Sequence, residues 1–223
     1  MVTELINILR KEMEAHSNEA IAKNMSAYLK NRFDCFGIKS PVRNSIQKDW
    51  FKKVKSAKLN HWDLIYNLWE LDQREYQYIA VDYANKLPKK DIGLDDYKYL
   101  EQLIITKSWW ETVDGLASNS VGAYFLKYPE QIDPVITRWR NSDNLWLNRT
   151  CLIFQLKYKE NVDFDLLKSL IIQYKDVKEF FIQKAIGWSL RQYSKFKPEE
   201  VKSFVEEIGL EGLAGREAIK YLD

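Results

Sequence analysis

The chain is poor in the residues that build metal and disulfide sites. It has two cysteines, Cys35 and Cys151, and two histidines, His16 and His61, among 223 residues. The cysteines are far apart in sequence, and no Cys/His spacing matches a zinc motif. We therefore expect no metal, no cofactor and no disulfide framework, and a reducing cytoplasm as the protein's location.

Long apolar runs and an excess of one charge are also missing. No run approaches the roughly 18–20 apolar residues that a membrane helix needs, and the N-terminus lacks the pattern of a signal peptide. The 34 basic residues are nearly balanced by 32 acidic ones. We expect no membrane contact, and any nucleic-acid surface has to come from local clustering of basic residues rather than from net charge.

Glycine and proline are scarce, with eight and five residues, which favours long regular elements. Apolar residues recur at helical spacing almost throughout, so the fold class predicted is all-α. Helices are expected at 3–15, 19–33, 42–55, 61–71, 73–87, 95–105, 109–126, 130–141, 144–159, 163–174, 178–194, 198–208 and 213–222.

Small residues recur in every second predicted helix. Ala80, Ala117, Cys151, Ala185 and Ala218 are 37, 34, 34 and 33 residues apart. A period in the mid-thirties with two helices per unit is typical of an α-solenoid, and no tetratricopeptide consensus is present. We predict a single domain of HEAT-like repeats over 1–223, a right-handed α-α superhelix, with a helical cap at 1–55 and regular repeats over 56–223. We expect it to be a monomer.

The segment Thr106–Asp114 is the most distinctive in the chain. Ser108 and Glu111 have the spacing of a capping box, and Trp110 and Asp114 are four residues apart on one helical face. Relative to the small residue of its repeat, Trp110 is at −7, Asp114 at −3 and Trp188 at +3, which span about 120° of helix circumference. These three residues are predicted to face one groove. Arg149, at −2, lies about 100° further round, and periodicity alone does not add it.

Several segments together resemble the AlkD family of bacterial DNA glycosylases. The similarity runs in order through almost the whole chain and is carried by Leu68–Leu71, Thr106–Asp114, Ser142–Arg149, Phe154–Lys159, Lys178–Trp188 and Arg216–Lys220. The resemblance implies a HEAT-like solenoid that holds duplex DNA in its concave face. It also implies excision of cationic N3- and N7-alkylated purines in base excision repair, and hence an association with the nucleoid.

The resemblance further implies which residues act. Trp110, Asp114 and Trp188 would form the active site, with Arg149 as its phosphate-binding and catalytic arginine. A DNA-contacting set would comprise Tyr28, Lys39, Lys157, Lys184 and Arg191. Lys39 departs from the family pattern, which has a glutamine there.

The residues taken alone also permit a structural interpretation. Tryptophan in an all-α protein is usually core, and we assign Trp69, Trp109 and Trp146 to packing. Arg149 would then be a surface residue or an inter-repeat ion pair, and the lysines would be solvated. The alternative function is a non-catalytic HEAT-repeat protein that binds branched DNA or a protein partner.

Overall fold

A computed structural model describes residues 1–222. These residues form helices and no β-strand, which confirms the predicted fold class. The chain falls into two compact units, an N-terminal unit of Met1–Leu87 and a C-terminal unit of Pro88–Asp223. The prediction of one domain with a cap at 1–55 stays a prediction.

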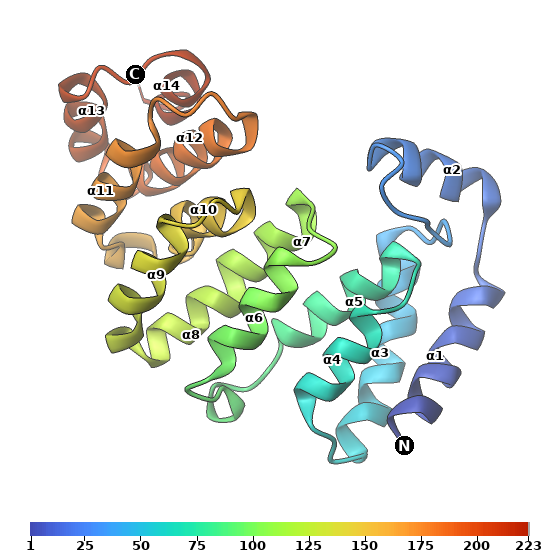
Figure 1. Ribbon diagram of the computed structural model, residues 1–223. Coiled ribbons are helices and arrows are strands. Elements are labelled where there is room, and N and C mark those ends of the chain that lie inside the picture. The colour runs from blue at the N-terminus through green and yellow to red at the C-terminus, as the bar shows by residue number, and fades with distance from the viewer. Residues whose placement is uncertain (223) are drawn as a thin grey trace. The chain divides into compact units, whose positions relative to one another are not determined.

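The N-terminal unit contains five helices within the described residues (Figure 1). They are α1 (Val2–Ala15), α2 (Glu19–Tyr28), α3 (Ser40–Ser56), α4 (His61–Trp69) and α5 (Arg74–Ala84). Its core is formed by apolar side chains that are almost fully buried, including Leu9, Met13, Leu64, Leu68, Trp69 and Ile79.

The C-terminal unit consists of helix pairs. In chain order its helices are α6 (Asp96–Ile105), α7 (Trp110–Gly115), α8 (Gly122–Lys127), α9 (Ile132–Arg140), α10 (Leu145–Ile153), α11 (Phe164–Tyr174), α12 (Phe180–Ser194), α13 (Pro198–Glu207) and α14 (Gly212–Ala218). A π-helical turn, Leu116–Val121, joins α7 to α8. Single 3₁₀ turns lie at Lys89–Asp91, Pro129–Gln131 and Lys159–Asn161.

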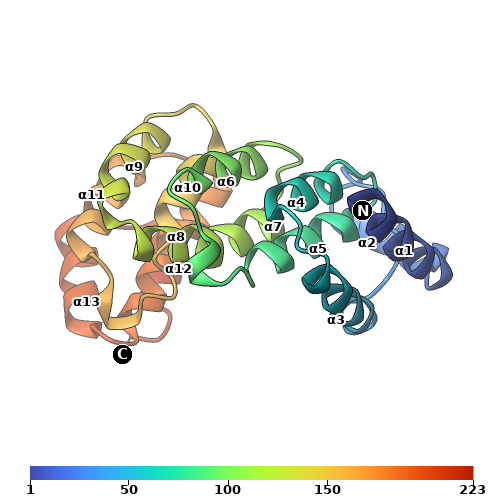
Figure 2. The same cartoon turned by 90° about the horizontal axis from the view of Figure 1, so that it is seen from below.

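The second helices of successive pairs pack against one another. Contacts join α7 to α10, α10 to α12 and α12 to α14, while α9, α11 and α13 follow one another along the left edge of Figure 2. Ala117, Cys151, Ala185 and Ala218 are all at most 1% exposed. A small residue at this register lets neighbouring helices approach closely, as the repeat spacing predicts.

Side-chain caps explain several of the helix starts. The Oδ1 atom of Asn60 accepts from the backbone of Trp62 at 2.8 Å and of Asp63 at 3.2 Å. Asn144 holds the start of α10 in the same way. Such caps satisfy amides that have no partner inside the helix.

Some predicted boundaries are wrong. The helix expected at 19–33 ends at Tyr28, because Lys30 and Asn31 take positive φ angles of 59° and 54°. The helix expected at 144–159 ends at Ile153, and the one expected at 213–222 ends at Ala218. The helix expected at 109–126 is interrupted by the π turn. Apolar periodicity continues through these breaks, so it does not reveal them.

The capping box is also wrong. Trp109, not Ser108, precedes the first residue of α7, and no side chain caps that helix. The Ser108 hydroxyl instead donates to the Ile104 carbonyl at 2.6 Å, at the end of α6. A serine can satisfy either helix end, and sequence spacing does not distinguish the two.

Candidate active site

A pocket of about 240 Å³ opens among α7, α10, α12 and α14 of the C-terminal unit. It is lined by Trp110, Arg149, Phe180, Phe181, Lys184, Trp188, Arg191 and Glu217. Three of the four predicted active-site residues, Trp110, Arg149 and Trp188, therefore meet at one pocket. The fourth, Asp114, does not line the pocket, but it accepts a hydrogen bond from Arg149, which does line it.

Asp114 and Arg149 form a two-point ion pair between adjacent repeats. Arg149 Nε donates to Asp114 Oδ1 at 2.7 Å, and Arg149 Nη2 donates to Asp114 Oδ2 at 2.8 Å. The remaining terminal nitrogen of Arg149 donates to the Phe181 carbonyl. The Asp114 side chain is 14% exposed and the Arg149 side chain is 5% exposed. A buried guanidinium is tolerated only when its donors are satisfied in this way.

This pair decides between the two structural interpretations of Arg149. Arg149 is not a surface residue; it is an inter-repeat ion pair that also forms part of a pocket wall. Helical periodicity alone does not place it there, because the angle of a Cα position takes no account of a long side chain that reaches across to the neighbouring helix.

Burial raises the pKa of Asp114 above its ordinary value, and the hydrogen bonds and positive charge of Arg149 act against that shift. The residue lies one position before the end of α7, and its backbone carbonyl accepts from Ser118 Oγ at 2.8 Å. Ser118 belongs to the π turn, an irregularity that often occurs beside functional sites. No sequence signal identified this turn.

The aromatic residues divide into a packing set and a pocket set. Trp109 is buried, with ring centroids 5.9 Å from Trp146 and 5.5 Å from Phe181. This cluster fixes Phe181, whose carbonyl binds Arg149. Trp110 and Trp188 remain partly exposed and line the pocket. The assignment of Trp69 and Trp109 to the core is confirmed.

The two predicted DNA-contacting cations on α12 share a carboxylate that the sequence analysis missed. Lys184 Nζ lies 2.9 Å from Glu217 Oε1, and Arg191 pairs with Glu217 Oε2. The hydrogen bond from Lys184, followed by that from Arg191, lowers the pKa of Glu217. The sequence does contain a signal that points to Glu217 as the partner of these cations. Lys184 and Glu217 are 33 residues apart, and Asp114 and Arg149 are 35 apart, so each opposite-charge pair is separated by about one repeat.

The other predicted DNA-contacting residues lie outside the pocket. Lys157 is exposed, and its amine donates to Asn119 Oδ1 on the π turn. Tyr28 and Lys39 belong to the N-terminal unit. Tyr28 ends α2 with 67% of its surface exposed, and the exposed Lys39 precedes α3. Their contact with DNA stays a prediction.

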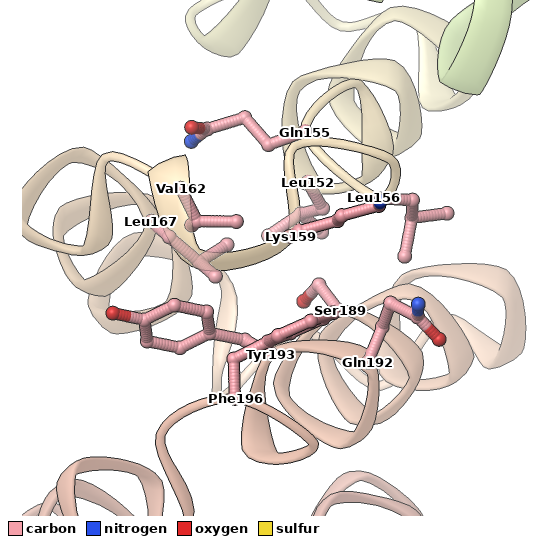
Figure 3. A pocket seen from close by; sticks show the side chains of 10 residues that line it. All are labelled: Leu152, Gln155, Leu156, Lys159, Val162, Leu167, Ser189, Gln192, Tyr193 and Phe196. Atoms are coloured by element: carbon pink, nitrogen blue, oxygen red, sulfur yellow. The ribbon is translucent and has the colours of Figure 1, made fainter.

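A second space in the same unit has a different character. It lies between α10, α11 and α12, and Figure 3 shows side chains such as Leu152, Leu167 and Tyr193 converging on it. Its volume of about 10 Å³ has room for a single water molecule at most. It is a packing defect rather than a ligand site.

Within residues 1–222 no three His, Cys, Asp or Glu side chains are grouped so as to hold a metal ion. In the same part of the chain no helix has both the length and the apolar character needed to cross a membrane.

The architecture and the pocket define a class: a helical-repeat protein with a buried arginine–carboxylate pair beside an aromatic, cation-rimmed pocket. The model of the family described as DNA alkylation repair enzyme matches residues 9–222, and the chain belongs to this family. The resemblance to AlkD-like proteins is thereby confirmed, and membership implies DNA as the partner.

Similar solved structures are consistent with this family assignment. A predicted DNA alkylation repair enzyme from Enterococcus faecalis is 35% identical, with a TM-score of 0.85 over 92% of this chain and 96% of that one. AlkD2 from Streptococcus mutans shares the fold at 19% identity, with a TM-score of 0.62 over 91% of this chain and 99% of that one. No curated protein gives a significant match.

Proposed function

We propose that the protein is a DNA glycosylase that excises cationic N3- and N7-alkylated purines from duplex DNA by hydrolysing the N-glycosidic bond. The observation that carries the proposal is the buried Asp114–Arg149 pair beside a pocket lined by Trp110 and Trp188. Family membership supports the repair of alkylated DNA, and the pocket suggests how the chemistry is done.

The substrate's charge sets what the protein has to supply. An N3- or N7-alkylated purine is cationic and leaves as a neutral base, taking the electron pair of the glycosidic bond with it. A strong general acid is therefore unnecessary. The sugar that remains has oxocarbenium character, and water adds to its C1′ atom with loss of a proton to solvent. What accelerates the reaction is stabilisation of that positive charge.

Asp114 is the group suited to that task. Each carboxylate oxygen has two lone pairs, and Arg149 uses one on each oxygen. The remaining lone pairs can face the sugar cation or orient water. Arg149 fixes the carboxylate in position, and because it also lines the pocket it can contact a phosphate. The faces of Trp110 and Trp188 would attract the cationic lesion, each by about 0.5–2 kcal/mol.

The rest of the DNA grip would come from cations and from one exposed aromatic residue. Lys184 and Arg191 lie at the pocket, Lys157 beside the π turn, and Tyr28 and Lys39 on the N-terminal unit. Phosphate contacts of this kind position a duplex without reading its sequence, and they make affinity fall steeply with salt.

The test is release of 3-methyladenine and 7-methylguanine from methylated duplex DNA by wild type and by Asp114→Asn. We expect release by wild type and a loss of about hundredfold or more in the variant, with folding and most DNA affinity retained. A fully active Asp114→Asn protein would contradict the proposed mechanism. No release by wild type, with salt-sensitive DNA binding intact, would instead favour the non-catalytic DNA-binding alternative.

A further inference from the structure

Glu217 occupies an unusual place for a residue at a DNA-binding pocket. It is an acidic side chain, 20% exposed, that lines the pocket and binds both of the cations on α12. Lys184 and Arg191 are themselves 37% and 21% exposed. The groups expected to bind phosphate are therefore already paired with a carboxylate of the same protein.

The fold provides for this contact at Gly187, which lies between the two cations on α12. A Cβ atom at Gly187 would come within 2.4 Å of Glu217 Cβ and 2.9 Å of the Ala214 carbonyl oxygen. Only a residue without a side chain allows α14 to come this close. The approach sets Glu217 against α12 within reach of Lys184 on one side and Arg191 on the other.

The charges at the pocket follow from these pairs. Asp114 balances Arg149, and Glu217 balances one of the two α12 cations. The pocket therefore has a net excess of one positive charge, where it would have two without Glu217. A DNA phosphate that approaches Lys184 or Arg191 has to displace Glu217 or lie close to it, and like charges in proximity oppose binding. Binding of a cationic lesion is favoured instead, because a carboxylate in the pocket wall attracts its positive charge.

We propose that Glu217 is a specificity-determining residue that competes with DNA phosphate for Lys184 and Arg191 and so weakens binding of undamaged duplex relative to duplex with a cationic lesion. The discrimination between the two duplexes rests on the proposed glycosylase function. The competition with phosphate does not.

The experiment measures the affinity of Glu217→Gln for an undamaged duplex over a series of salt concentrations. Glutamine preserves the shape of the side chain and removes its charge. The matched control is Glu206→Gln, which removes the same charge from an exposed residue of α13 outside the pocket. We expect Glu217→Gln to bind undamaged duplex roughly three- to tenfold more tightly. The dependence of log affinity on log salt should steepen by about one. The control should stay close to wild type.

A second measurement tests the coupling. Lys184→Gln is made in the wild-type and in the Glu217→Gln backgrounds. If Glu217 occupies Lys184, removing the lysine weakens binding less in wild type than in the Glu217→Gln protein. If Glu217→Gln unfolds at a lower temperature than wild type, Glu217→Asp replaces it. The shorter aspartate side chain withdraws the carboxylate from the cations, so the affinity for undamaged duplex should rise by a smaller factor.

The two proposals fail separately. Unchanged or weaker binding of undamaged duplex by Glu217→Gln would overturn the competition, whatever the catalytic activity. Tighter binding without base release by wild type would uphold the competition and reject the glycosylase. If both hold, undamaged competitor DNA should inhibit excision more strongly in Glu217→Gln than in wild type. Equal inhibition would overturn the role in specificity.

Discussion

Each unit contains a carboxylate withdrawn from solvent, and the two have different partners. Glu75 of the N-terminal unit is fully buried and accepts three backbone amides, from Phe36 at 3.0 Å, Gly37 at 2.9 Å and Ile38 at 3.0 Å. Asp114 of the C-terminal unit accepts from a single side chain, Arg149, which lines a pocket.

The difference shows how withdrawing a carboxylate from solvent can serve different ends. Backbone amides are fixed by the fold, so Glu75 ties the segment between α2 and α3 to α5. An arginine side chain can exchange partners, and Arg149 is within reach of anything that enters the pocket. Burial of a carboxylate is therefore weak evidence for a role in function, whereas its partner is informative.

The largest effect is expected from Arg149→Ala. The substitution leaves Asp114 buried without its cation, which should lower the free energy of unfolding by about 3–5 kcal/mol, and it should abolish base release. Thermal and urea unfolding measure the first effect and base release from methylated duplex the second. Arg149→Lys keeps the charge but not the two-point geometry, and should recover only part of each loss. Wild-type stability in Arg149→Ala would contradict the assigned role of the pair.

Glu75→Gln should affect stability without affecting chemistry. The glutamine oxygen can still accept from Gly37 and Ile38, but its amide group would face the Phe36 amide, donor against donor. We expect the free energy of unfolding to fall by roughly 2–3 kcal/mol. Urea unfolding beside Glu70→Gln, an exposed site on the same unit, measures it. Unfolding of both variants at the same urea concentration would count against the anchoring role of Glu75.

The smallest effect at neutral pH concerns the titration of Asp114. Its pKa is raised by burial, and in the proposed mechanism the ionised form stabilises the sugar cation. Excision should therefore be independent of this group at high pH and fall as the pH drops through a value above the ordinary aspartate pKa of about 4. Single-turnover rates from about pH 4 to about pH 8, corrected for spontaneous depurination, test this. If the excision rate fell only at or below about pH 4, the result would contradict a pKa of Asp114 raised by burial.

Sequence periodicity predicted the helical class, the helix pairs and the buried small residues, because burying one face of a helix leaves a regular pattern. The π turn after Asp114 and the early end of α2 at Tyr28 left no such trace, since both are local backbone choices within continuous apolar patterns. At the site, the spacing of Trp110, Asp114 and Trp188 was informative, but Arg149 required the family resemblance and Glu217 was missed. Pairing opposite charges one repeat apart would have found both.

The most direct test compares the two carboxylates in one assay. Single-turnover excision rates at saturating methylated duplex, expressed per folded protein, are measured for Asp114→Asn and Glu75→Gln. The predicted result is a loss of about hundredfold or more for Asp114→Asn at a lower melting temperature, because Arg149 loses its counter-charge, and a near wild-type rate for Glu75→Gln, which is also less stable. Comparable rates in the two variants would contradict the assignment of the reaction to Asp114.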